Sequence, residues 1–173
     1  MKSLIIINSN LHPEHKQISQ SFCAEIVHRG SPCEILDMNN PNLQLHEKYY
    51  AIEKVNPDWI ITLDFAGFEC RSGMGDVSLN RIPCRMVHLI LQEPEDGSID
   101  AEEHFNYSMY FIVSKEEYGK QLKTNSSVVH IHTLPELMGI TAERNGSEVI
   151  STLLQQLWDI TEMSMDFTEC RRL

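Results

Sequence analysis

Residues 57–91 have the sequence PDWIITLDFAGFECRSGMGDVSLNRIPCRMVHLIL, and this stretch decides the fold. An apolar run over residues 59–63 ends at Asp64, a loop rich in Gly, Ser and Asp follows, and a second apolar run covers residues 85–91. Continuous apolar runs of this length are typical of parallel strands that are buried on both faces. In an open α/β sheet, ligands bind in the crevice outside the carboxyl ends of the strands. We therefore expect the polar residues after position 63 to lie at a ligand-binding edge.

The rest of the chain alternates strands with helices. Apolar runs predict strands over residues 3–7, 33–38, 108–113 and 127–131. Helical periodicity predicts one helix between Pro13 and Gly30 and others over residues 43–55, 115–123 and 147–161, with a capping box formed by Ser114 and Glu117 before the third. The tail, residues 163–173, has no clear period. This order predicts one three-layer, doubly wound α/β domain over residues 1–173, Rossmann-like or flavodoxin-like, with a mainly parallel sheet.

Charge and composition exclude several classes of partner. The chain has 173 residues and a formal net charge of −11, which repels nucleic acid and anionic membrane surfaces. No apolar run approaches the roughly 20 residues of a membrane-spanning helix, and the run over residues 4–7 is too short for a signal peptide. The five cysteines include no CxxC pair, which favours reduced thiols and a cytoplasmic location.

The turn after the first strand contains candidate ligand-binding residues. Neither G-x-G-x-x-G nor a phosphate-binding P-loop occurs, so the sequence has no dinucleotide fingerprint. Asn8, Asn10 and His12 are nevertheless able to hydrogen-bond a sugar or a nucleotide-like ligand. The alternative is that the Asn and Ser residues of this turn only complete the turn and cap the following helix.

A second group of candidates follows the third strand. Asp64 is placed either to bind a ligand or to accept backbone N–H groups of the loop. Gly67 allows close approach of the backbone to a ligand, and Asn80 provides an amide for hydrogen bonding. Arg81 suits an anionic group, or instead stiffens the loop by pairing with one of its acidic residues.

Two histidine pairs resemble parts of a metal site. His130 and His132 share one face of a strand, and His12 and His15 lie in the first turn of a helix. Neither pair has an obvious third ligand, whereas zinc takes three or four from the protein. We therefore expect these histidines to be structural or solvated, with no metal bound.

The segments NPDWIITLDFAGFE (56–69) and SLNRIPCRMVHLIL (78–91) resemble the N-terminal Rossmann-like domain of GT-B glycosyltransferases. The nearer relatives are the spore-protein CgeB-like group and related short bacterial proteins of unknown function. The resemblance implies that Asn10, His12, Asp64 and Asn80 lie on the acceptor side of a cleft. GT-B enzymes hold the donor nucleotide-sugar mainly on a second domain, for which 173 residues leave no room, so independent glycosyl transfer is in doubt.

Three functions therefore remain open. The first is binding of a sugar or nucleotide-like small molecule, with a second protein subunit or a homodimer completing the site and no cofactor required. The second is a flavodoxin-like reductase, for which Asn8-Ser9-Asn10 would bind the phosphate of FMN. The third is a non-enzymatic interaction domain that uses the acidic segment 93–103 as its contact surface.

Overall fold

The computed structural model describes residues 1–71, 74–94, 104–125, 127–141, 143–144 and 146–162. Strands are numbered β, α-helices α and short 3-10 helices η. In chain order the elements are β1 (Ser3–Ile7), α1 (His15–His28), β2 (Cys33–Asp37), α2 (Leu45–Val55), β3 (Trp59–Leu63), η1 (Ser78–Arg81), β4 (Arg85–Ile90), β5 (Met109–Val113), α3 (Glu116–Leu122), β6 (His130–Thr133), η2 (Pro135–Gly139) and α4 (Ser147–Glu162). Gly73, most of the acidic segment and the tail 163–173 lie outside the described residues.

The six strands form one parallel sheet in the order β2-β1-β3-β4-β5-β6. This confirms the predicted α/β class, and the parallel arrangement extends to every pair of neighbouring strands in the sheet. The strand order reverses direction between β1 and β3, which makes this pair the topological switch point. None of the described helices is long and apolar enough to cross a membrane.

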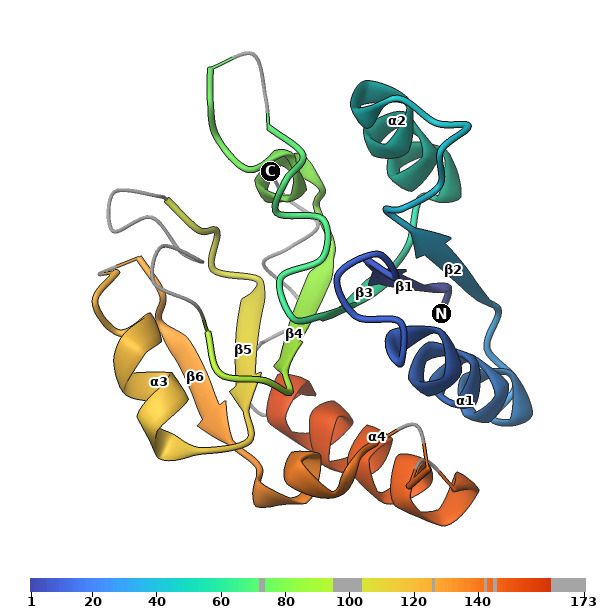
Figure 1. Cartoon of the computed structure of the whole chain (residues 1–173), viewed down its shortest axis with the longest axis vertical. Helices are drawn as coiled ribbons and strands as arrows, with labels where there is room; N and C mark the ends of the chain where they lie inside the picture. The colour runs from blue at the N-terminus through green and yellow to red at the C-terminus, as the bar shows by residue number, and fades with distance from the viewer. Residues whose placement is uncertain (72–73, 95–103, 126, 142, 145, 163–173) are drawn as a thin grey trace.

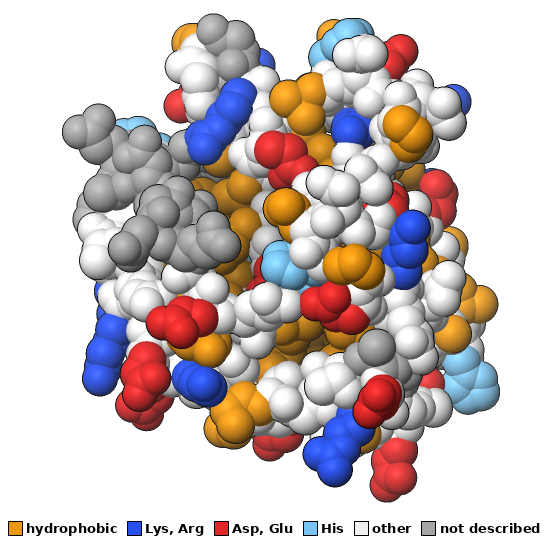
Figure 2. Space-filling view, viewed as in Figure 1, with side chains coloured by type: hydrophobic (Ala, Val, Ile, Leu, Met, Phe, Trp, Pro, Cys, Tyr) orange, Lys and Arg blue, Asp and Glu red, His pale blue; other side chains and the backbone are white. Residues whose placement is uncertain are grey.

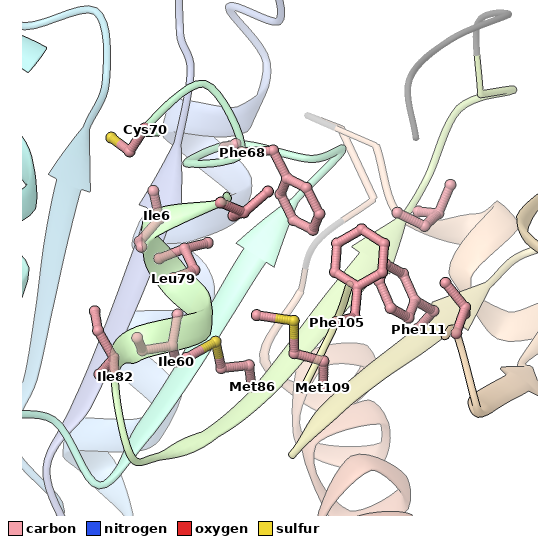
Figure 3. Packing of buried hydrophobic residues seen from close by; sticks show 14 of the residues in the cluster. Ile6, Ile60, Phe68, Cys70, Leu79, Ile82, Met86, Phe105, Met109 and Phe111 are labelled. Atoms are coloured by element: carbon pink, nitrogen blue, oxygen red, sulfur yellow. The ribbon is translucent and has the colours of Figure 1, made fainter. Parts of the chain in front are cut away.

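Helices cover both faces of the sheet (Figure 1). On one face, α1 and α4 pack over Ile61 and its neighbours, with Phe22 and Leu157 buried in the interface. On the other face, α2, α3 and the segment between β3 and β4 bury a separate apolar cluster. Phe68 of that segment points toward Phe105 and Phe111 (Figure 3), with ring centroids 5.7 and 6.3 Å away.

Two local predictions require correction. The third helix, α3, begins at Glu116 with Lys115 at the N-cap, so Ser114 does not cap it. Ser114 instead extends β5, since its N–H donates to the carbonyl oxygen of Ile90. The sixth strand begins at His130 rather than at residue 127, because the N–H of Ser127 donates to the side chain of Asn125 in a turn.

Candidate functional site

The loops that follow β1 and β3 are joined by hydrogen bonds across the switch point. The side-chain amide of Asn8 donates to Oε1 of Glu69 at 3.3 Å, and the backbone N–H of Gly67 donates to Oε2 of the same carboxylate at 2.7 Å. The N–H and hydroxyl of Ser9 both donate to Asp37, at 3.1 and 2.5 Å. The Asn8 amide and both donors of Ser9, which could otherwise bind a phosphate in this turn, are therefore bonded to carboxylates of the chain itself.

These bonds also set the charge of Asp37. Partial burial would raise the pKa of this carboxyl, but hydrogen bonds from Ser9 and the backbone of Asn39, together with the nearby charge of Lys16, outweigh it. The pKa of Asp37 is therefore lowered and the carboxylate is ionised at neutral pH. A second negative charge in the same position, such as a phosphate, would be repelled.

Asp64 turns the chain at the end of β3 and ties it to the end of β4. Its backbone and that of Phe65 both have positive φ angles, 43° and 61°, which bulky side chains seldom adopt. Oδ1 accepts the backbone N–H groups of Leu91 and Gln92 at 2.7 and 3.1 Å. Asp64 was expected either to bind a ligand or to accept backbone N–H groups of the loop after β3. It does accept backbone N–H groups, but they belong to the residues after β4.

The second oxygen of Asp64 faces a buried histidine. Oδ2 lies 3.0 Å from Nε2 of His15, and the two side chains are only 6% and 1% exposed. The contact does not have the geometry of a hydrogen bond, and neither Nδ1 nor Nε2 of His15 has a hydrogen-bond partner among the described residues. His15 is therefore a buried polar side chain that is placed beside a carboxylate and is not otherwise satisfied.

His12 and Glu14 lie beside His15 at the start of α1. The rings of His12 and His15 have centroids 4.6 Å apart, and Nδ1 of His12 lies 3.8 Å from Oε1 of Glu14. The same Glu14 oxygen accepts the side-chain amide of Gln92 at 2.8 Å. The start of α1 is thus connected to the end of β4 through polar side chains.

A cleft of about 500 Å³ opens beside this group. Its walls come from the start of α1, the end of β4 and the segment around η2. It is lined by Glu14, His15, Ile18, Leu91, Gln92, Leu137, Met138, Ile140, Thr141 and Glu143. The surface in Figure 2 shows apolar side chains in recesses of the face viewed in Figure 1, with acidic and histidine side chains around them. The volume lies within the range of about 300–1,000 Å³ that is usual for small-molecule sites.

None of the predicted ligand-binding residues lines this cleft, although His12 and Asp64 lie beside His15, which does. Asn10 is exposed, and its N–H donates to Oδ1 of Asn8 at 3.2 Å. Asn80 bonds the 104–106 segment from both ends of its amide: Nδ2 donates to the carbonyl oxygen of His104, and Oδ1 accepts the N–H of Asn106. Of the predicted group, the structure brings together Asn8 with Gly67 through Glu69, and His12 with Asp64 through His15.

Arg81 lies at a second cleft, of about 370 Å³, on the opposite face of the sheet. This cleft is lined by Leu45, His46, Tyr49, Tyr50, Cys70, Arg71, Ser78 and Arg81. Arg81 is exposed and forms no ion pair within the described part of the chain, so the proposed pairing with an acidic loop residue is not found there. It contributes positive charge beside Tyr49.

Two other groups of reactive or metal-ligating side chains give weaker support for a functional site. His130 and His132 both stack on the ring of Tyr110, at 4.5 and 6.3 Å, and no third ligand accompanies them among the described residues. Burial raises the pKa of the Cys84 thiol to about 12, so that this cysteine stays protonated at neutral pH. It is therefore poorly suited to act as a nucleophile.

The residues that sequence reasoning missed are Glu14, Gln92 and the wall around η2. For His15 a signal was present: it lies three residues before Ile18 and seven before Phe22, on the apolar stripe of α1. A polar side chain on a buried stripe needs a partner, which marks it for attention. No comparable signal indicated that residues 137–141 and Glu143 lie beside the start of α1.

No protein-family model matches the sequence, and no curated protein matches it at a significant level. The fold and the geometry of the cleft therefore carry the functional argument.

Proposed function

We propose that this protein binds a sugar-containing small molecule in the cleft beside His15, as an acceptor-side domain of the glycosyltransferase type would. The observation that carries the proposal is the cleft itself, which combines an apolar floor with the hydrogen-bonding side chains of Glu14, Gln92, Thr141 and Glu143. Carboxylates accept hydrogen bonds from hydroxyl groups, and an amide both donates and accepts. The apolar floor suits the carbon face of a sugar ring.

The charge of the cleft favours a neutral ligand portion over a phosphate. Glu14 and Glu143 contribute two carboxylates to its lining, and none of the described residues that line it is an arginine or a lysine. The same argument weighs against the FMN alternative, because Ser9 donates to Asp37 and Asn8 donates to Glu69 in the turn where a phosphate would bind.

A nucleotide-like ligand is the second candidate, and the cleft at Arg81 supports it. Arg71, Arg81 and His46 line this cleft together with Tyr49 and Tyr50. Guanidinium groups suit phosphate, and tyrosine rings suit a base. In this case the ligand would bind on the α2 face of the sheet.

A thermal-shift series on the purified chain tests the proposal with neutral sugars, nucleotide-sugars, free nucleotides and FMN. A ligand specific for the folded state adds about 2.7 kcal/mol at a hundredfold excess over its dissociation constant. We expect a sugar-containing compound to raise the melting temperature. Gln92→Ala should weaken the binding of that compound at least fivefold. The matched control is Gln155→Ala, because this exposed glutamine of α4 lies away from the cleft.

Two results would contradict sugar binding in this cleft. One is the absence of a shift with every sugar-containing compound. The other is a shift that Gln92→Ala leaves unchanged. A shift with nucleotides that Arg81→Ala abolishes would assign binding to the second cleft instead.

A further inference from the structure

Three metal-ligating side chains converge at the start of α1. His12, Glu14 and His15 each offer one ligand atom, and these three atoms lie within 4.8 Å of one another. In tetrahedral zinc sites the ligand atoms are about 2.0–2.2 Å from the ion, which places them roughly 3.3 Å apart. His12 and Glu14 are 24% and 37% exposed, so their side chains have room for the small adjustment that coordination requires.

The second and independent observation is His15 itself. Its side chain is 1% exposed, yet both ring nitrogens lack a hydrogen-bond partner among the described residues. A buried polar group without a partner is costly, typically by about 1–3 kcal/mol. An ion bound to one ring nitrogen would satisfy this side chain, which also lines the cleft beside α1.

Asp64 occupies the place of an outer carboxylate. Its Oδ2 lies 3.0 Å from Nε2 of His15, which leaves Nδ1 as the nitrogen without a close carboxylate. Metal-binding histidines usually donate their other ring N–H to a carboxylate or carbonyl, which fixes the tautomer and the ring orientation. Gln92 similarly donates to Glu14 at 2.8 Å and restrains that carboxylate.

From this arrangement we infer that His12, Glu14 and His15 bind one divalent transition-metal ion, with Asp64 and Gln92 as outer-sphere groups. Two imidazoles and one carboxylate suit zinc or another late first-row ion, whereas magnesium and calcium prefer oxygen ligands only. Three protein ligands leave a coordination position for water or for a ligand hydroxyl. The inference does not depend on sugar binding, because metal binding is measured directly.

Zinc titration of the full chain, after dialysis against a chelator, tests the site by isothermal calorimetry or by competition with a chromophoric chelator. We expect one equivalent of Zn²⁺ per chain. His12→Ala and Glu14→Gln should each weaken binding at least tenfold without unfolding the protein, since both side chains are partly exposed. Asp64→Asn, which keeps the side-chain shape, should weaken it about 10–100-fold through its effect on His15.

The controls separate this site from other zinc ligands of the chain. His28 lies in the last turn of the same helix and is exposed, so His28→Ala should leave binding unchanged. Cys23→Ser should also have no effect, although Cys23 lies beside Cys33. Absence of zinc binding, equal binding by wild type, His12→Ala and Glu14→Gln, or loss of binding only in Cys23→Ser would overturn the assignment. Zinc binding without any sugar-induced shift would leave the metal site standing and reject the proposed function.

Discussion

His88 makes the stability of this protein depend on pH in a way that can be calculated. It lies fully buried in the middle of β4, with Nδ1 2.6 Å from the hydroxyl of Thr62 and its ring 4.8 Å from those of Phe68 and Phe111. Burial lowers the pKa of His88 from 6.5 to about 3, because the charged imidazolium would be separated from water. Below pH 6.5 the unfolded chain therefore binds a proton that the folded chain does not.

The sign and size of the effect follow from this difference. Well above pH 6.5 the histidine is neutral in both states and adds no pH dependence. As the pH falls from 6.5 toward 3, the free energy of unfolding decreases by about 1.4 kcal/mol per pH unit. The loss attributable to His88 is thus about 1 kcal/mol at pH 5.5 and about 3 kcal/mol at pH 4.5.

Replacing His88 with phenylalanine isolates this contribution. The phenyl ring keeps the aromatic contacts and removes the titrating group, while the unpaired Thr62 hydroxyl adds a cost that does not vary with pH. Urea unfolding of both proteins, followed by tryptophan fluorescence at pH 7.5, 5.5 and 4.5, gives the free energies of unfolding. Asp37 and Glu25 also have lowered pKa values, so their contributions to the free energy of unfolding are lost in acid. Both groups titrate alike in the two proteins, and these losses therefore cancel in the difference between them.

The stability of His88→Phe relative to wild type should therefore rise by about 3 kcal/mol between pH 7.5 and 4.5. The exposed histidine of α1 provides the control, since His28→Phe should show no comparable trend. A difference between His88→Phe and wild type that stays constant over this range would refute the reasoning, because it would mean that folded His88 accepts a proton as readily as the unfolded chain.

Three further changes in the free energy of unfolding are expected in urea titrations at neutral pH. Gly67→Ala should lower the free energy of unfolding by about 1–3 kcal/mol, because φ is +92° and the new Cβ would lie 3.2 Å from Leu79. Gly139→Ala should lower it by less than about 1 kcal/mol, because its Cβ would meet open space. Equal losses for the two variants would contradict this account. Phe22→Ala should cost about 3–5 kcal/mol, since the ring is fully buried between α1 and the sheet, and a cost below about 1 kcal/mol would mean that it is not. Asp64→Ala should cost about 2–4 kcal/mol through the lost bonds to the end of β4, and Asp64→Asn should cost less because Oδ1 is kept; the reverse order would contradict this.

The fold was predictable because its buried strands have a distinct sequence pattern. Buried parallel strands are continuous apolar runs, as in residues 59–63, and the helices between them end at residues with left-handed backbone, such as Gly30 and Asn56. The start of β6 was misjudged because Val128 and Val129 look like strand residues. In the structure Val128 is buried although it follows a turn in which Ser127 bonds to Asn125 and lies outside the strand. The apolar pattern alone does not distinguish a buried residue after a turn from a buried strand residue.

The candidate site was only partly predictable, for a physical reason. Sequence position identifies which residues follow a parallel strand, and Asp64 and His12 were found in this way. It does not reveal which residues the chain itself uses as partners: Asn80 is bonded to the 104–106 segment and Asn8 to Glu69. Nor does it show that Glu14 of α1 and Gln92 after β4 meet, because that contact depends on how closely α1 approaches the end of β4.

The bonds across the switch point explain why the candidate site lies to one side of it. In doubly wound folds the crevice between the loops after β1 and β3 is the usual place for a ligand. Here Asn8 donates to Glu69, and Ser9 donates to Asp37, so these donors of the first loop are already bonded to carboxylates. A buried polar side chain without a hydrogen-bond partner among the described residues, His15, lies on the α1 face of the sheet beside Asp64. The carboxylates of Glu14 and Asp64 disfavour an anion at this position, which agrees with both proposals, because a sugar hydroxyl is neutral and a divalent metal ion is cationic.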